Sequence, residues 1–137
     1  MSTSAHPFPL EHEPPYLIRI TMAGDFDGDA IHALFDEIDQ LIGEQPFWLF
    51  HVDISELGHA SPSARRAGAE RIGKTPGYSL VLYGGGLAQR AVSTLFLKVA
   101  ELFSGGREVV TKFAKDRDAA DEWIAAEQRR REAAPSG

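Results

Sequence analysis

The sequence predicts an α/β fold, with a single-layer, mostly parallel, four- to five-stranded sheet flanked by about four helices. Three observations support this prediction. Apolar segments with a strand pattern alternate with amphipathic segments of helical period along most of the 137 residues. The run Phe47–Val52 is almost wholly apolar, which is typical of a strand that is covered on both faces. No internal repeat or long linker divides the chain, so we expect one domain.

The first third of the chain is expected to form two strands and one helix. Phe8–Glu13 has the pattern of a short edge strand that ends at two prolines, and Tyr16–Met22 has that of a core strand. The glycine and aspartate residues of Gly24–Asp29 predict a turn. From Ile31 to Ile42, apolar residues recur at three- and four-residue steps, which predicts a helix against the sheet.

The rest of the chain continues the alternation after the strand Phe47–Val52. Ser61 and Pro62 form a strong helix start, because a serine hydroxyl accepts from a free backbone N–H and proline needs no hydrogen bond at the first position. The further elements are expected at Pro62–Lys74 (helix), Tyr78–Tyr83 (strand), Leu87–Phe103 (helix), Glu108–Phe113 (strand) and Asp116–Arg131 (helix). We expect residues 1–15 to be a partly disordered arm, residues 16–127 the domain, and residues 128–137 a polar tail.

The composition excludes several classes of function. A net charge of -6 argues against nucleic acid and anionic membranes as main partners, because both need a basic surface. The chain contains no cysteine, so disulfides and thiolate chemistry are excluded, and the five histidines show no metal-ligand spacing. No signal peptide and no membrane span is expected, which favours a cytoplasmic protein without cofactor or metal.

The helix expected at Leu87–Phe103 is apolar over more than one core-facing stripe. The extra width predicts a second contact, either with a twin subunit in a homodimer or with an apolar ligand. Before the helix stand Gly84, Gly85 and Gly86, whose backbone N–H groups suit either a tight turn or an anion site. The candidate residues for ligand binding are therefore Gly84, Gly85, Gly86, Leu95, Phe96 and Val99.

The segment Asp25–Asp29 has the pattern D-x-D-G, which resembles the nucleophile loop of haloacid-dehalogenase-like phosphatases. In that alternative, Asp25 would attack phosphorus and Asp27 would act as the acid. The segment lacks the Thr or Ser that those enzymes place after the glycine, and its glycine comes too early for a calcium loop. We therefore expect a turn, with Asp27 or Asp29 capping the next helix.

Four stretches of the chain resemble the STAS family, the sulfate-transporter and anti-sigma-factor-antagonist domain, in its small stand-alone sporulation branch. This branch is sometimes grouped by fold with CRAL-TRIO lipid-binding domains. The stretches are Tyr16–Asp25, Val52–Ser55, Tyr83–Phe103 and the pair Lys112–Ala114 with Asp118–Ile124. The resemblance implies a bacterial signalling module without enzymatic activity, with an anti-sigma factor or a kinase as its protein partner.

In signalling members of that family, a serine after the central strand is phosphorylated. The matching position is Ser63, with Ser61 as the neighbouring candidate, although Pro62 and Ala64 depart from the family pattern. The resemblance implies an interaction surface around this corner, made by Asp53, Ser55, Glu56, His59, Arg65 and Arg66.

Two hypotheses from different classes therefore stand side by side. The first is a non-enzymatic STAS-like interaction module, and the second is a binder of a lipid-like or anionic small ligand. An exposed polar surface around Ser63 favours the first, whereas a cavity against the helix Leu87–Phe103 favours the second.

Overall fold

The computed structural model describes residues 8–102 and 105–133 and confirms the predicted α/β class. The disorder expected for the first residues lies outside this described part of the chain. In chain order the elements are β1 (Leu10–Glu13), β2 (Leu17–Phe26), α1 (Gly28–Ile42), β3 (Phe47–Ala60), α2 (Pro62–Ile72), β4 (Gly77–Tyr83), α3 (Leu87–Leu102), β5 (Val109–Ala114) and α4 (Arg117–Ala133).

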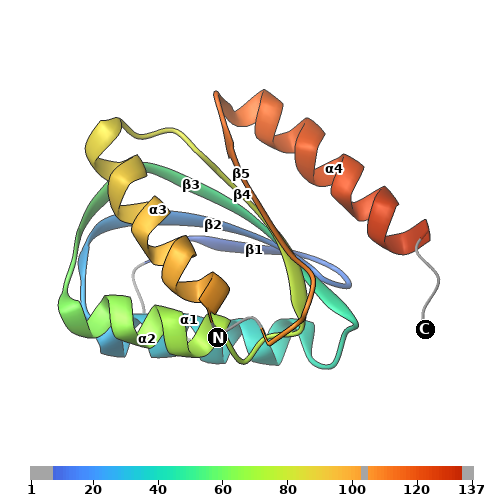
Figure 1. Ribbon diagram of the computed structural model, residues 1–137, viewed down its shortest axis with the longest axis horizontal. Coiled ribbons are helices and arrows are strands. Elements are labelled where there is room, and N and C mark those ends of the chain that lie inside the picture. The colour runs from blue at the N-terminus through green and yellow to red at the C-terminus, as the bar shows by residue number, and fades with distance from the viewer. Residues whose placement is uncertain (1–7, 103–104, 134–137) are drawn as a thin grey trace.

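The strands form a five-stranded sheet in the order β1-β2-β3-β4-β5. Strand β1 is antiparallel to β2, and each of the other neighbouring pairs is parallel. The connection between two parallel strands is almost always a right-handed crossover. The three crossovers from β2 to β5 step across the sheet in the same direction, so their helices lie on the same face of it. Figure 1 shows this arrangement, with α1, α2 and α3 together on one side of the sheet and α4 on the other.

Strand β3 lies at the centre of the sheet and supplies core residues to both faces. Successive side chains alternate between the faces. Phe50 points to the side of α1, α2 and α3, where Ile38 of α1 is also fully buried. Leu49 and, on β4, Val81 point to the side of α4 and are fully buried there.

The helix starts follow the predicted capping pattern. Asp27 caps α1, and its carboxylate oxygen accepts from the backbone N–H of Ala30 at 3.1 Å. Ser61 caps α2 in the same way, accepting from Ala64 N–H at 3.1 Å, and Pro62 follows as the first helical residue. These local signals place the beginnings of α1 and α2 correctly from the sequence alone.

Strands β2 and β3 are longer than predicted. The first half of the expected turn Gly24–Asp29 is strand, as is the expected polar corner after Val52, because these two segments pair with each other. Ala23 lies opposite Glu56, and Phe26 lies opposite Ala60, with two register irregularities on the way. Mutual backbone hydrogen bonding thus replaces the turns that polar composition suggested.

This paired extension reaches beyond β4, which ends at Tyr83 opposite Asp53. Figure 1 shows that β2 and β3 bend there towards the start of α2. The polar side chains of Ser55, Glu56 and His59 are exposed on it, whereas Ile54 and Leu57 are buried.

The C-terminal segment also differs from the prediction. We expected a polar tail over residues 128–137, but α4 continues to Ala133, and residues 134–137 lie outside the described part. The reason is Arg131, whose side chain is only 7% exposed. Its guanidinium donates to Ser79 Oγ at 2.7 Å and to the carbonyl of Tyr78 at 2.9 Å, which anchors the last turns of α4 to β4.

Candidate functional site

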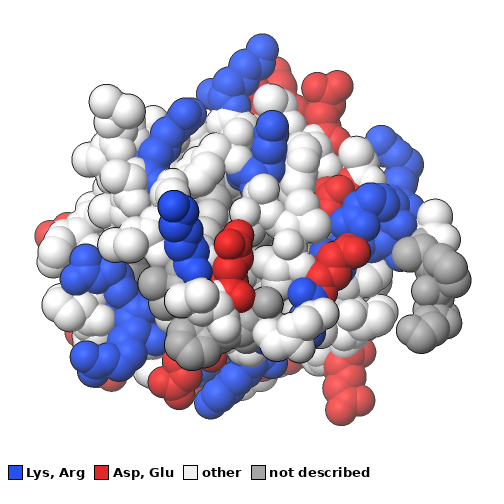
Figure 2. Space-filling model, viewed as in Figure 1, with Lys and Arg blue, Asp and Glu red and all other residues white. Residues whose placement is uncertain are grey.

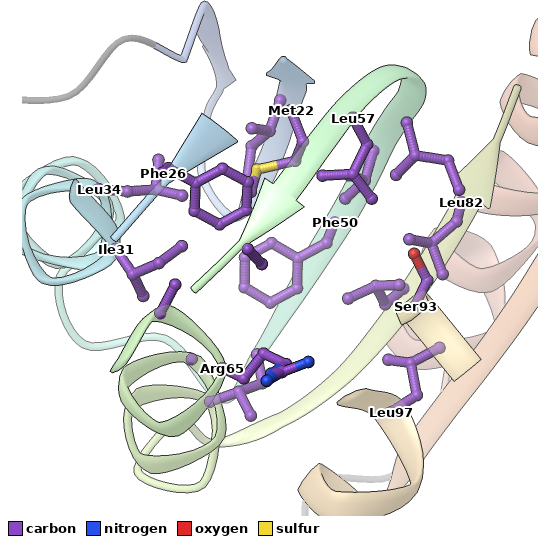
Figure 3. A pocket seen from close by; sticks show the side chains of 18 of the residues that line it. Met22, Phe26, Ile31, Leu34, Phe50, Leu57, Arg65, Leu82, Ser93 and Leu97 are labelled. Atoms are coloured by element: carbon purple, nitrogen blue, oxygen red, sulfur yellow. The ribbon is translucent and has the colours of Figure 1, made fainter. Parts of the chain in front are cut away.

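A cavity lies between the sheet and the three helices α1, α2 and α3. Its volume is about 130 Å³, and nearly all of its wall is apolar. Figure 3 shows Phe50 on the floor, Ile31 and Leu34 on one side, and Leu82 and Leu97 on the other. Close-packed interiors rarely contain voids larger than a water molecule, so this space is a departure from ordinary core packing.

The cavity exists because short side chains line it where the helices approach the sheet. On α2, the positions that face the sheet are Ala64 and Gly68. On α3, the wall is made by Val92, Ser93 and Leu97. Helix α2 packs mainly on α1 rather than on the sheet, which leaves the space open.

Among the described residues that line the cavity, the polar side chains are Arg65 of α2 and Ser93 of α3, and of these Arg65 carries a charge. Figure 3 shows the Arg65 side chain extending from α2 into the gap towards α3. The Arg65 side chain is exposed, and its guanidinium forms no hydrogen bond or ion pair with the described residues. The site therefore combines an apolar chamber with one unpaired guanidinium.

A cavity does lie against α3, but Leu95 does not line it. Leu95, predicted to line a cavity, is 57% exposed on the outer side of α3. The inner side carries Val92, Ser93 and Leu97 instead. The period of α3 alone did not separate the two sides, because both are apolar. The side chains of Phe96 and Val99 lie outside the described part of the structure.

The glycines before α3 form a tight turn. Gly84 and Gly85 have φ values of +80° and +73°, which L side chains rarely adopt. Gly86 N–H donates to the side-chain oxygen of Gln89 at 2.9 Å. A Cβ on Gly84 would lie 3.2 Å from a carboxylate oxygen of Asp53. This negative neighbour disfavours the anion site that was considered for Gly84–Gly86.

The predicted interaction surface is divided among separate places. Asp53 and Ser55 lie against Gly84, and the Asp53 carboxylate accepts from the Ser55 N–H at 2.8 Å. His59 N–H donates to the Asp25 carboxylate at 2.7 Å on the extension of β2 and β3. The structure thus ties these residues to the sheet.

Ser61 and Ser63 lie at the start of α2, next to the start of α1. Ser63 Oγ accepts from the backbone N–H of Gly28 at 3.0 Å and lies 2.9 Å from Ser61 Oγ. An open polar cleft between the two helices adjoins Ser63. It is lined by Asp27, Gly28, Asp29, His32, Ser63, Arg66, Ala67 and Glu70. Arg66 therefore belongs to this cleft, while Arg65 belongs to the apolar cavity.

The two aspartates of the phosphatase alternative have structural roles. Asp25 accepts from His59 N–H on the sheet extension, and Asp27 caps α1. Within the described residues, no group of three or more His, Cys, Asp or Glu side chains is placed to hold a metal ion. No helix of the described part has both the length and the apolar character needed to cross a membrane.

A polar cluster under α4 was not predicted from the sequence. His51, on β3, is 2% exposed, and its Nε2 lies 2.8 Å from a carboxylate oxygen of Asp121. The same oxygen accepts from Arg19 at 2.9 Å. The N–H direction of the His51 ring does not meet hydrogen-bond geometry with any described residue, so the contact with Asp121 is electrostatic.

The cluster shifts the protonation of its members. Burial lowers the pKa of His51, the nearby Arg19 guanidinium acts in the same direction, and Asp121 opposes both. For Asp121, burial alone would raise the pKa, but the hydrogen bond from Arg19 and the charge of His51 outweigh it and the pKa is lowered. The sequence gives one signal for this cluster, a histidine inside an apolar strand.

Comparison of the chain with protein-family models, curated proteins and solved structures found no match.

Proposed function

We propose that the protein is a non-enzymatic binding protein that holds the apolar part of a small molecule in the cavity beneath α3. The observation that carries this proposal is the apolar chamber of about 130 Å³ in the middle of a closely packed α/β domain. Dry apolar cavities of about 150 Å³ bind molecules such as benzene or xenon. The size suits an apolar group of about six carbons.

The alternative of an enzyme has less support in the geometry. The chamber wall offers Arg65 and Ser93 but no acid, histidine or second nucleophile among the described lining residues. An acyl or phosphoryl transfer needs a nucleophile, a base and a site for developing negative charge close together. The residues of the chamber wall therefore suit ligand binding better than catalysis.

A STAS-like interaction module remains the second candidate. It is favoured by the exposed position of Ser63, whose hydroxyl bridges the starts of α1 and α2. A phosphate there would add acceptor oxygens beside the Gly28 N–H and place negative charge beside Asp27 and Asp29. Such a change would alter the surface that a protein partner meets.

One mass measurement tests both candidates. The protein is purified from its native host, and its intact mass is taken under native and denaturing conditions. Extra mass that disappears on denaturation supports the ligand-binding function. Extra mass of one phosphate that persists and maps to Ser63 supports the second candidate. An unmodified chain that also fails to take up an added apolar compound contradicts both.

A further inference from the structure

We propose that the ligand of this cavity is a compact amphipathic anion, whose charged group pairs with Arg65 and whose apolar part fills the chamber. This proposal rests on the ligand-binding function above and adds the chemical class of the ligand. It excludes neutral hydrocarbons and amphipathic cations as the preferred occupants.

Arg65 is an exposed side chain that borders the cavity, and its guanidinium differs from that of Arg71, further along the same helix. The Arg71 guanidinium donates to Asp36 at 2.8 Å and to Asp39 at 3.2 Å, and it lies over the ring of Phe35. Arg65 has no such partner among the described residues. A guanidinium is always charged and presents a fork that matches a carboxylate or phosphate, so Arg65 has the chemistry to pair with an anion at the edge of this cavity.

The two adjacent arginines of α2, Arg65 and Arg66, have different surroundings. Arg66 points to the polar cleft that also contains Asp27, Asp29 and Glu70. Arg65 instead shares its cavity with apolar side chains and Ser93, and none of the described residues that line this cavity is acidic. Charges interact more strongly beside apolar surface than in water. An anion at Arg65 is therefore stabilised, and a cation there is repelled.

The net charge of the whole chain also affects how an anion can bind. A net charge of -6 repels small anions from most of the surface. A site that takes an anion must therefore supply its own positive group, and within the cavity wall that group is Arg65. The rest of the ligand must be apolar and compact, because the chamber holds only about six carbons.

The experiment compares three six-carbon probes that differ only in the head group. Hexanoate, hexan-1-ol and hexylammonium are titrated into the full chain at about pH 7.5, where hexanoate is an anion and hexylammonium a cation. Binding is measured by calorimetry and by NMR of the methyl groups. We expect hexanoate to bind about tenfold more tightly than hexan-1-ol, as one hydrogen bond between charged groups provides. Hexylammonium should bind most weakly.

Two matched variants assign the preference to one residue. Arg65→Gln should weaken hexanoate about tenfold and leave hexan-1-ol unchanged, which also shows that the variant is folded and its chamber intact. Arg66→Gln removes the same charge one position along α2, next to the other cleft, and should change neither affinity.

Equal affinities for hexanoate and hexan-1-ol in the unmodified protein would overturn the anion preference while leaving the apolar binding function in place. The same holds if Arg65→Gln and Arg66→Gln weaken hexanoate equally, because the effect would then be one of general charge. If none of the three probes binds, the ligand-binding function itself fails.

Discussion

At the scale of single residues, the buried His51 makes the stability of the fold depend on pH. In the unfolded chain its pKa is about 6.5. Burial and the Arg19 guanidinium hold the folded value lower. Between the two values the unfolded state binds the additional proton, so the free energy of unfolding falls as pH falls through that window. The neutral ring is the form that the folded protein accommodates.

We therefore expect the protein to be less stable at pH 5.5 than at pH 7.5 in urea unfolding experiments, with the loss beginning below about pH 6.5. His51→Gln should flatten this dependence. His59→Gln, which removes an exposed histidine from the end of β3, is the control and should retain it. An unchanged slope in His51→Gln would show that other groups cause the effect.

At the same scale, short-range sequence signals were reliable. Asp27, Ser61 and Gly43 cap helices as their residue types predict, because a cap depends on a few neighbouring backbone groups. The role of Arg65 was not predictable in this way. Its position next to an apolar space depends on how α2 and α3 lie over the sheet, which no local pattern encodes.

At the scale of elements, the order of strands and helices follows from the alternation of patterns, whereas the length of β3 does not. Asp53 to Ala60 is polar and has the composition of a loop, yet it pairs with the end of β2. A strand that has a partner on one side and solvent on the other tolerates such residues. Pairing between distant segments therefore overrode local propensity.

The end of α4 gives an element-scale prediction. Arg131 anchors this helix to Ser79 and to the carbonyl of Tyr78, and its guanidinium lies over the ring of Phe47. Arg131→Ala should lower the free energy of unfolding by about 2–3 kcal/mol, because it leaves buried polar groups unpaired. It should also speed amide hydrogen exchange in the last turns of α4.

Arg129→Ala is the matched control for this prediction. Arg129 lies on the same helix but is exposed, so its removal should change stability by less than about 0.5 kcal/mol. Equal effects of the two variants would contradict the anchoring role of Arg131.

Helix α3 is apolar on more than the side that lines the cavity. Its apolar width indicated a second contact, but the outer side carries Leu87, Leu95 and Leu102 exposed at 89%, 57% and 81%. Figure 2 shows uncharged atoms over much of the surface at this helix, with Lys and Arg side chains among them. The homodimer expected from this apolar width stays a prediction.

At the scale of the whole molecule, the cavity makes the fold less stable than a filled core but leaves space for a ligand. Filling an empty apolar space stabilises a core, whereas the same space is needed for a ligand. Ala64→Leu places a larger side chain at the cavity wall. It should raise the free energy of unfolding by about 1 kcal/mol and abolish binding of six-carbon probes. Thermal and urea unfolding measure the first effect, and titration measures the second.

The control is the same substitution in tightly packed core on the other face of the sheet. Ala120 of α4 is fully buried and does not line the cavity. Ala120→Leu should lower the free energy of unfolding by about 1–3 kcal/mol through overpacking. If Ala64→Leu destabilises the protein to the same extent, the space beneath α3 is not available as the structure indicates.

The central claim is that the chamber beneath α3 accepts an apolar molecule, and benzene tests it most directly because it has no head group. Benzene is titrated into the unmodified protein and into Ala64→Leu while methyl NMR signals are followed. The account predicts saturable shifts of the methyl groups of Ile31, Leu82 and Leu97 in the unmodified protein, and none in Ala64→Leu. Methyl signals that do not respond to benzene in the unmodified protein would contradict it.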